Sequence, residues 1–356
     1  RRMATSKSTS TAASTSNIAL YRKYRPQTFA DVVEQDAVVN TLKSSIEQGR
    51  ITHAYIFAGS RGTGKTSIAR IYARALKVSD NDVYEIDAAS NRGIDDIREI
   101  REGVNVSPFE SPYKVYIIDE VHMLTKEAWN ALLKTLEEPP AHALFILATT
   151  ELEKIPDTII SRCQVFSFKK PSRDTLKAVV TKIAKKESVV LEAGVAELIA
   201  LLGDGSFRDT LGTLDKIISS SDGKKVSMAE AEAITGAPRG TLVNEFIRGI
   251  LVADATVSLD ALHKAVESGA SVKSFASLTL EKFRILLMMK TAPKFADKLR
   301  DLISEDDWKV LGEFVAAHPD RIVSASLVEL LKSYDLIGHS YIPALPLELA
   351  VIKLVV

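Results

Sequence analysis

The spacing of hydrophobic residues divides the chain into regions of different character. Between residues 18 and 170, short runs that are almost wholly apolar alternate with amphipathic stretches. Apolar runs of this length predict parallel strands that are covered on both faces of a sheet. We expect five such strands, at residues 54–58, 83–87, 115–119, 144–149 and 165–168. With helices between them, the region is predicted to be an α/β domain with a five-stranded parallel sheet.

One of the predicted helices has recognisable ends. Residues 126–138 place Ala128, Leu132 and Leu136 on one face. Thr125 precedes this run as a predicted N-cap, and Pro139 follows it, where a helix cannot continue.

Beyond Pro171 the pattern is helical only. Residues 171–236 predict a small helical unit that begins at Ser172 as a cap, and residues 237–356 predict longer helices, including one at 275–289. The closing segment, 344–356, is too apolar to stand alone, so we expect it to pack on its own domain or on a neighbouring subunit. At the other end, residues 1–17 are rich in Ser, Thr and Ala and are predicted to be a disordered tail.

Charge and cysteine content narrow the possible partners and compartments. Lys plus Arg and Asp plus Glu both total 46, so the net charge of zero draws the whole molecule toward neither nucleic acid nor membrane, and a DNA contact must come from a local patch. The single cysteine, Cys163, excludes an intrachain disulfide and a cysteine-based metal site. No apolar run approaches the roughly 18–20 residues of a membrane helix. We therefore expect a cytoplasmic protein that does not bind membranes.

A glycine-rich segment carries the clearest chemistry. Residues 59–66 read GSRGTGKT, directly after the predicted strand at 54–58 and before a helical run, which matches a phosphate-binding loop in its usual context. The glycines let backbone amides approach the phosphates, and the helix N-terminus adds positive charge. We predict that Lys65 neutralises phosphate charge and that the Thr66 hydroxyl ligates Mg²⁺. The ATP-binding loop is expected to consist of Gly59, Ser60, Arg61, Gly62, Thr63, Gly64, Lys65, Thr66 and Ser67.

An acidic pair supplies the second half of this site. The predicted strand at 115–119 ends in Asp119, and Glu120 follows. We predict that Asp119 holds the Mg²⁺ water shell and that Glu120 activates a water for attack on the γ phosphate. Acidic residues also follow many buried strands, but the phosphate-binding loop upstream favours the catalytic interpretation. Asp followed by Glu favours hydrolysis over phosphoryl transfer to another substrate.

Three further polar residues each allow two interpretations. Thr149 ends the strand expected beside that of the loop, where its hydroxyl either positions the attacking water and senses the γ phosphate or only caps the strand. Arg162 lies between a helical stretch and a strand, near the sheet edge, and Arg208 opens a helix in the 171–236 unit. From the residues alone, both arginines are interpreted as solvated surface charges.

Together these motifs resemble the AAA+ ATPases and, within them, the gamma/tau family of bacterial clamp-loader subunits. The likeness runs from Ala19 to the end of the chain. Its most specific pieces are YRKYRPQTF at 21–29, HAYIF at 53–57, EIDAASNRG at 85–93, DEVHML at 119–124, LEEPP at 136–140 and SRC at 161–163. Replication factor C, a eukaryotic and archaeal relative, normally lacks the DEVHML and LEEPP pieces.

The resemblance implies roles at the matching positions. It implies an AAA+ core at 18–170, a helical lid at 171–236 and a helical collar at 237–356 that joins five subunits in a ring. Thr149 resembles sensor 1, Arg162 the arginine finger that reaches the nucleotide of the neighbouring subunit, and Arg208 the sensor 2 residue. The implied catalytic set is Lys65, Asp119, Glu120, Thr149, Arg162 and Arg208. The segment that packs around adenine and ribose is matched by Tyr21, Arg22, Arg25, Pro26, Val32 and Val33.

The chain departs from the family pattern at one place. Family members usually carry a four-cysteine zinc module before the EIDAASNRG piece, whereas only residues 77–84 lie between Leu76 and Glu85 here. No zinc ligands remain, so zinc is not expected, and the sequence leaves open whether the lineage lost the module or the numbered chain omits it. The resemblance also implies that the chain stops at the end of the collar, before the region with which the long form of the family binds helicase and polymerase.

The function implied by the resemblance is that of a clamp-loader motor subunit. Its ATP cycle would load a sliding clamp onto primer-template DNA, in an assembly with delta-like and delta-prime-like subunits and further copies of itself. One alternative is a non-catalytic scaffold subunit, which can lose Lys65, Thr66 or the acidic pair; all are present here. Another is an AAA+ ATPase with a different client, which would not need the DEVHML and LEEPP pieces.

Overall fold

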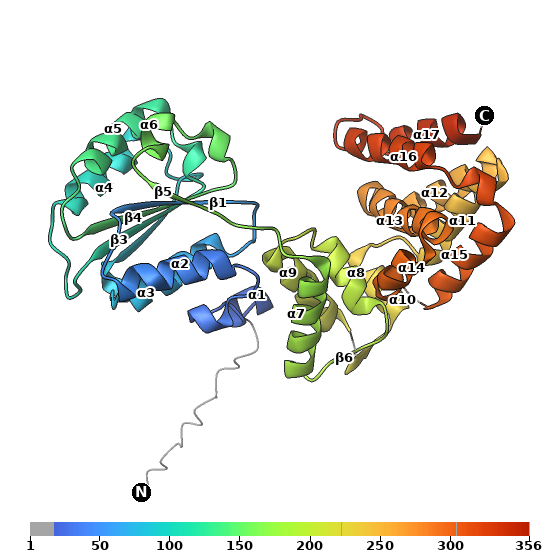
Figure 1. The fold of residues 1–356 in the computed structure, drawn as a ribbon, viewed down its shortest axis with the longest axis horizontal. Coiled ribbons are helices and arrows are strands. Elements are labelled where there is room, and N and C mark those ends of the chain that lie inside the picture. The colour runs from blue at the N-terminus through green and yellow to red at the C-terminus, as the bar shows by residue number, and fades with distance from the viewer. Residues whose placement is uncertain (1–17, 222, 304, 356) are drawn as a thin grey trace, which may run out of the picture. The chain divides into compact units, whose positions relative to one another are not determined.

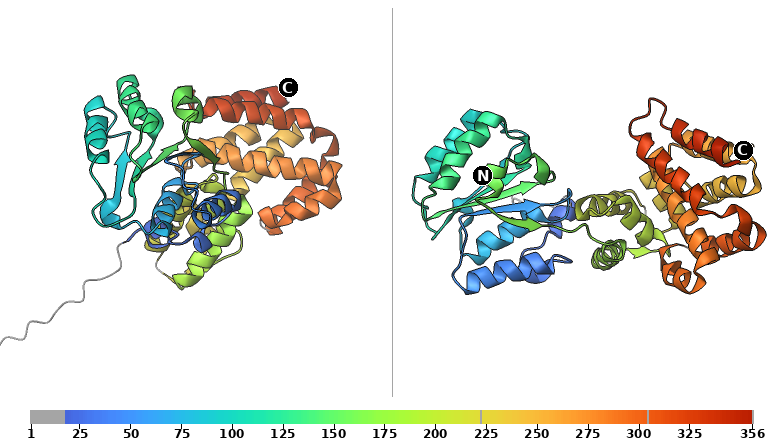
Figure 2. Two further views of the ribbon diagram at one scale, coloured as in Figure 1. Left: turned by 60° about the vertical axis from the view of Figure 1, so that its left-hand side comes forward. Right: turned by 45° about the horizontal axis from the view of Figure 1, so that its top comes forward.

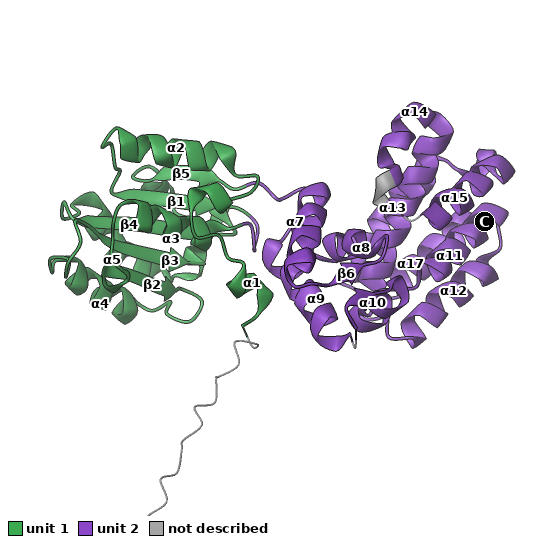
Figure 3. Cartoon of the chain, turned by 90° about the horizontal axis from the view of Figure 1, so that it is seen from below, with its two compact units in different colours: residues 1–59, 64–168 green, residues 60–63, 169–356 purple. Residues whose placement is uncertain are grey.

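The computed structural model describes residues 18–221, 223–303 and 305–355, which form two compact units (Figure 3). The first unit holds the described residues up to 59 together with 64–168, and the second holds 60–63 and the described residues from 169 onward. The tail predicted at 1–17 lies outside the described residues. The chain passes from the first unit to the second after Phe168, close to the predicted end of the core at 170, whereas the division of the second unit at 236 stays a prediction.

A five-stranded parallel sheet forms the centre of the first unit, in the order β2-β3-β4-β1-β5 (Figure 1). The strands are β1 (Ala54–Ala58), β2 (Val83–Asp87), β3 (Lys114–Asp119), β4 (Ala143–Thr149) and β5 (Gln164–Ser167). All five predicted strands are confirmed within one residue at each end. The three central strands are buried along almost their whole length, which is why their sequences are apolar without alternation.

Helices cover both faces of this sheet (Figures 1 and 2). On one face, α2 (Asp36–Glu47) and α3 (Lys65–Ala75) pack against alternate strand residues such as Tyr55 and Phe57. On the other face, α4 (Ile94–Val104), α5 (Lys126–Glu137) and α6 (Asp157–Ile160) pack against the residues between them, such as Ile56. Because successive strand side chains point to opposite faces, one apolar run supplies both cores.

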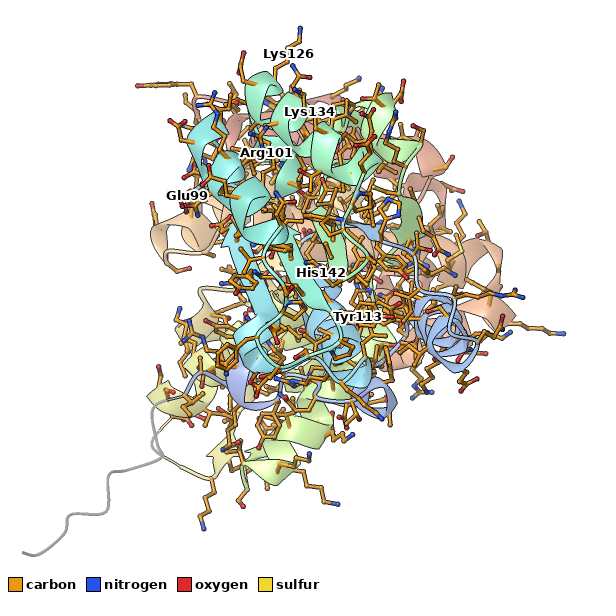
Figure 4. The ribbon with its side chains drawn as sticks, turned by 90° about the vertical axis from the view of Figure 1, so that its left-hand side faces the viewer. Glu99, Arg101, Tyr113, Lys126, Lys134 and His142 are labelled. Carbon is orange, nitrogen blue, oxygen red and sulfur yellow. The ribbon has the colours of Figure 1, made fainter. Side chains whose placement is uncertain are left out.

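The predicted helix at 126–138 is confirmed as α5, whose cap Thr125 accepts a hydrogen bond from the Ala128 backbone N–H at 3.3 Å. Figure 4 labels Lys126 and Lys134 on this helix and Glu99 and Arg101 on α4, which packs on the same face of the sheet. The short elements of this unit are α1 (Leu20–Lys23), η1 (Phe29–Asp31), η2 (Asp80–Asp82), η3 (Val121–Met123) and η4 (Leu152–Lys154).

The second unit is helical, as predicted, apart from one small strand pair. Its first helices are α7 (Arg173–Lys186), α8 (Val195–Leu202), α9 (Phe207–Ser220) and α10 (Met228–Thr235). Ser172 caps α7 by accepting from the Thr175 backbone N–H at 3.1 Å, which confirms that predicted cap. The expectation that strands end after Pro171 is wrong in one detail, because β6 (Val190–Leu191) and β7 (Lys225–Val226) form a parallel pair. Strands of two residues are too short to leave a periodic signal.

A single hydrophobic cluster holds the remaining helices of this unit together. The elements are α11 (Gly240–Val252), α12 (Ala255–Glu267), α13 (Val272–Thr291), α14 (Pro293–Ala296), η5 (Asp297–Leu302), α15 (Glu305–Ala317), η6 (Pro319–Arg321), α16 (Ser324–Ile337) and α17 (Leu345–Val355). Within α17, Leu347 and Val351 are buried in that cluster, so the apolar closing segment packs on its own unit. Among the residues described, no helix has both the length and the apolar character needed to cross a membrane.

Candidate nucleotide-binding site

The glycine-rich segment connects β1 to α3, as the sequence predicted. Gly62 and Gly64 have φ values of +73° and +101°, which favour glycine, and Gly64 is the N-cap of α3. Gly59 lies against Phe168, the residue after β5, because a Cβ added to Gly59 would stand 2.6 Å from the Phe168 carbonyl oxygen. The loop conformation therefore depends on its glycines.

Residues 60–63 belong to the second unit, where they lie next to the start of α9. The Phe207 backbone N–H donates to the Gly62 carbonyl oxygen at 3.0 Å. A Cβ added to Gly62 would stand 2.0 Å from Ser206 Oγ and 3.4 Å from Arg208 Cβ. Within the second unit, Arg208, the predicted sensor 2 residue, therefore lies beside Gly62.

Lys65, the first residue of α3, is buried, with 6% of its surface exposed. Its Nζ donates to the Gly59 carbonyl oxygen at 2.7 Å. Burial lowers the pKa of Lys65, and the carboxylates of Glu120 and Asp119 partly oppose that shift. The ammonium group therefore lies in the electrostatic reach of both acidic residues predicted to act with it.

Thr66 and Asp119 are in direct contact, although they are distant in sequence. The Thr66 hydroxyl donates to Asp119 Oδ2 at 2.8 Å, and Asp119 Oδ1 accepts the Glu120 backbone N–H at 3.0 Å. A hydroxyl oxygen beside a carboxylate is a donor set that suits Mg²⁺. Their assignment as metal ligands stays a prediction. No group of three or more His, Cys, Asp or Glu side chains that would hold a metal ion occurs among the described residues.

Glu120 leaves β3 with an unusual backbone conformation, at φ +48°. Its carboxylate oxygen Oε2 accepts from the Thr150 hydroxyl at 3.1 Å. Thr149, at the end of β4, pairs in register with Ala58 of β1 and is fully buried. Its Oγ1 accepts the Glu151 backbone N–H at 3.0 Å. The predicted base, Glu120, and the predicted sensor, Thr149, therefore both lie at the carboxyl ends of the strands, next to the end of β1.

His122 is a residue of this edge that the sequence interpretation missed. It lies in η3 with a side chain 6% exposed, and its Nδ1 is 3.1 Å from Thr149 Oγ1 and 3.5 Å from Glu120 Oε2. Its Nε2 is 3.3 Å from Glu151 Oε1. The available signal was a polar ring inside DEVHML, three residues after Asp119 and within reach of the neighbouring strand end.

Arg162 lies between α6 and β5, at the edge of the sheet, as predicted. Its Nη2 pairs with Glu137 Oε1 at 2.8 Å and its Nη1 donates to the Thr158 carbonyl oxygen at 2.6 Å. Glu137 is a second residue that was missed; it belongs to LEEPP, one of the quoted motifs. The structure thus links the LEEPP and SRC pieces by an ion pair.

The predicted adenine and ribose segment begins in α1. Tyr21 and Arg22 lie within that helix, where the Arg22 guanidinium stands 5.7 Å from the centre of the Tyr21 ring. Arg25 and Pro26 follow α1, and the pair Val32 and Val33 follows η1. Val32 packs against the core on the α2 and α3 side, whereas Val33 is 42% exposed. The contribution of these six residues to a nucleotide site stays a prediction.

Comparisons with known proteins bear on the whole arrangement. A family model described as DNA polymerase III, delta subunit, matches residues 34–91 and 77–172. The chain is 39% identical to DNA polymerase III subunit tau of Bacillus subtilis over 357 residues, which is 94% of this chain and 63% of that protein. It is 38% identical to DNA polymerase III subunit gamma/tau of Mycobacterium tuberculosis over 304 residues, covering 79% of this chain and 53% of the relative.

Among solved structures, a RuvB mutant of Thermotoga maritima matches 81% of this chain and 91% of its own, with a TM-score of 0.51 and 17% sequence identity. At that identity the match speaks for the fold alone. Together with the parallel sheet and the loop after β1, it gives the class: the fold is that of the AAA+ ATPases. The sequence relatives are more specific: over most of its length the chain is similar to the tau and gamma/tau subunits of DNA polymerase III. It spans between about half and two thirds of the length of these two relatives.

Proposed function

We propose that this chain is an ATP-hydrolysing subunit of a clamp loader, which loads a sliding clamp onto primer-template DNA during replication. The observation that carries the proposal is the contact at the end of β3, where the Thr66 hydroxyl bonds Asp119 beside the buried Lys65. These three residues come from two motifs 53 positions apart, and a fold that does not use nucleotide has no need to bring them together. The gamma/tau relatives support the replication role.

In the proposed site, the chain supplies the charges and the orientation that phosphate binding requires. The backbone N–H groups of the loop and the start of α3 hold the phosphates, and Lys65 neutralises part of their charge. Thr66 and Asp119 would hold Mg²⁺, which supplies charge neutralisation between the β and γ phosphates when it is bound. Glu120, fixed by the Thr150 hydroxyl, accepts a proton from the attacking water.

Arg162 is proposed to act on the nucleotide of a neighbouring subunit. In the chain by itself, its guanidinium is paired with Glu137 at 2.8 Å. Both side chains are about two-fifths exposed, so this pair is weak and exchanges for a stronger anion at low cost. A phosphate of a neighbouring site would be such an anion, because Arg binds phosphate oxygens in two-pronged geometry.

The proposed partners are other clamp-loader subunits, the sliding clamp and primer-template DNA, in the cytoplasm. Because the net charge is zero, the proposed DNA binding would use a local basic patch that recognises backbone geometry and not base sequence. The rival proposals, a scaffold subunit and an AAA+ ATPase with a different client, differ in what stimulates the enzyme. A scaffold subunit would not hydrolyse ATP. An ATPase with a different client would hydrolyse ATP, but the clamp and DNA would not stimulate its turnover.

Two variants test the nucleotide site. Lys65→Ala should weaken ATP binding, since phosphate charge is left uncompensated, whereas Glu120→Gln should keep binding and lose turnover by about 10²- to 10⁴-fold. A nucleotide-binding titration beside a phosphate-release assay with clamp and primer-template DNA separates the two effects. Lys126→Ala and Glu127→Gln on the exposed surface of α5 are matched controls. Undiminished hydrolysis in Glu120→Gln would contradict the assignment of the base.

A mixing experiment tests the role of Arg162 between subunits. Arg162→Ala protein retains Lys65, and Lys65→Ala protein retains Arg162, so mixed assemblies contain complete sites at some interfaces. Each variant alone should hydrolyse ATP poorly. For Arg162→Ala, the loss of a strong arginine finger should lower the rate of hydrolysis by roughly 10³- to 10⁵-fold. Mixed assemblies, verified by mass measurement, should recover part of the activity. Full activity of Arg162→Ala alone would return Arg162 to a surface charge.

A further inference from the structure

His122 connects the predicted base to the predicted sensor, and nothing in the proposed function accounts for it. Its ring lies between the end of β3 and the end of β4 and is almost completely buried. The left-handed Glu120 starts η3 and turns the chain back, and fully buried Val121 anchors this turn. The ring is therefore held in one place by the backbone of its own turn.

The neighbours of the ring decide which nitrogen carries its proton. Glu151 accepts from Lys154, and this interaction holds the pKa of Glu151 below its usual value. An ionised carboxylate can only accept a hydrogen bond. The Nε2 atom, 3.3 Å from Glu151 Oε1, is therefore the donor. A ring with its single hydrogen on Nε2 has Nδ1 as an acceptor, and Nδ1 lies closer to Thr149 Oγ1, at 3.1 Å, than to Glu120 Oε2, at 3.5 Å.

That assignment orients the Thr149 hydroxyl. A hydroxyl group has one hydrogen to donate, and Thr149 is fully buried, so its hydrogen must find an acceptor inside the protein. Its oxygen already accepts the Glu151 backbone N–H. The Nδ1 atom of His122, at 3.1 Å, is the acceptor for the hydroxyl hydrogen.

We infer that His122 is a positioning residue for ATP hydrolysis: bonded to Glu151 through Nε2–H, it accepts the Thr149 hydroxyl at Nδ1 and holds that hydroxyl away from Glu120. The inference rests on the proposed ATPase function. The Glu120 carboxylate then keeps its two donors, the Thr150 hydroxyl and the attacking water, without competition from the sensor. No covalent step involves the ring.

Substitutions separate the two nitrogens. His122→Phe removes both, His122→Asn keeps a polar group near the place of Nδ1, and His122→Gln keeps one near the place of Nε2. His122→Phe should lower kcat by about 10- to 100-fold, as does the loss of groups that orient reactive side chains. ATP affinity and KM should stay unchanged, and His122→Asn should recover more activity than His122→Gln. His142→Phe is the matched control, because His142 bonds the Val104 carbonyl oxygen at 2.9 Å before β4 starts (Figure 4).

A double-variant cycle tests the route through Thr149. If His122 acts by orienting Thr149, then His122→Phe combined with Thr149→Val should be no slower than the slower single variant. Losses that multiply overturn the inference, and so do wild-type kcat in His122→Phe or a better recovery by His122→Gln than by His122→Asn. Thermal unfolding of each variant identifies any that fail to fold, and the Asn and Gln variants then carry the comparison.

Nitrogen NMR of the ring tests the inference without ATP turnover. The full chain, labelled with ¹⁵N-histidine, should show His122 protonated at Nε2 and unprotonated at Nδ1, and Thr149→Val should shift only the Nδ1 resonance strongly. A ring protonated at Nδ1 overturns the inference even if the enzyme is active. Absence of ATP hydrolysis in the wild-type chain with clamp and DNA, beside the expected NMR pattern, overturns the proposed function instead.

Discussion

Two buried lysines, one in each unit, show how differently a fold can use the same group. Lys65, predicted to bind phosphate, is 6% exposed and Lys282 of α13 is 3% exposed. For both, burial is the main cause of a lowered pKa, and neighbouring carboxylates oppose it. Exposure and pKa direction therefore do not distinguish a lysine of a reactive site from a structural one.

The acceptors around each ammonium group do distinguish them. Lys282 donates to the Gly240 carbonyl at 3.1 Å, to Asn244 Oδ1 at 2.8 Å and to Asp307 Oδ1 at 2.6 Å, which uses all three of its protons. Asn244 also donates to Asp307 at 2.8 Å. This cluster is closed, and it ties α11, α13 and α15 together.

At Lys65 the arrangement is different in kind. One of its hydrogen bonds, at 2.7 Å, goes to the neutral carbonyl of Gly59. Asp119, one of the two carboxylates that act on its charge, is hydrogen-bonded to Thr66. The lysine begins a helix at a loop of glycines, where backbone N–H groups add to the positive potential. The comparison teaches that a buried lysine whose three protons bond groups of neighbouring helices stabilises the fold, whereas one at a helix start beside a glycine loop suits an incoming anion.

The largest expected effect is on the closed cluster. Lys282→Met should lower the free energy of unfolding by about 3–5 kcal/mol, because it leaves the Asp307 carboxylate without its buried counter-charge. Urea unfolding measures this, and ATP binding by the folded fraction should be unchanged. Adding Asp307→Leu should restore much of the lost stability, since removal of both partners leaves no unpaired charge. A Lys282→Met protein of wild-type stability contradicts the structural role.

A smaller change in free energy is expected at Lys65, and it should affect ATP binding and not the stability of the fold. Lys65→Met should cost about 1.5–3 kcal/mol of ATP binding, the range for a hydrogen bond to a charged group, and should leave unfolding by urea close to wild type. Titration with a fluorescent ATP analogue measures the first and urea unfolding the second. A stability loss at Lys65 as large as that at Lys282 would break the comparison.

A buried aspartate in the first unit, Asp82, tests whether a fully hydrogen-bonded buried charge stabilises the fold there as well. Asp82 is fully buried and accepts backbone N–H bonds from Phe109, Glu110 and Ser111 at 2.5, 3.0 and 3.0 Å. Burial opposes its ionisation, but these bonds outweigh burial and hold the pKa of Asp82 below its ordinary 3.8. We expect Asp82→Asn to lower stability by about 1–3 kcal/mol at neutral pH, without loss of ATP binding.

The pH dependence of that loss follows from the direction of the pKa shift. A lowered pKa stabilises the fold above the ordinary aspartate pKa, and the contribution disappears as pH falls through the folded-state value. Wild type and Asp82→Asn should therefore differ at pH 7 and converge in acid. Urea unfolding at several pH values measures this, with the exposed Asp95→Asn as control. A difference that grows in acid contradicts the assignment.

The smallest effect is expected from a zinc chelator, which should leave the stability of the protein unchanged. The connection between Leu76 and Glu85 forms η2, which Ser79 caps and Asp82 ties to the 109–111 segment. These bonds hold the connection in place, and none of its residues is a cysteine, so a chelator should leave the thermal midpoint unchanged. Elemental analysis of protein purified without added metal should find no stoichiometric zinc. One tightly bound equivalent would contradict this prediction.

The sequence by itself determined the five strands of the first unit, two helix caps and the place of the glycine-rich loop. The five strands, the caps Thr125 and Ser172, and the loop between β1 and α3 are visible because apolar runs, caps and glycine spacing act over a few residues. The quoted motifs likewise led to the gamma/tau family, because they keep their order along the chain.

Only the tertiary structure decided which polar groups meet. His122 and Thr149 are 27 positions apart, Arg162 and Glu137 are 25 apart, and Lys282 is 38 positions from Asn244. The β6 and β7 pair joins segments on either side of α8 and α9. Such contacts depend on the order of the strands and on how helices pack, and local spacing carries no record of either. A buried hydrogen bond is selected by its surroundings in space, so its partner becomes known only when the chain has folded.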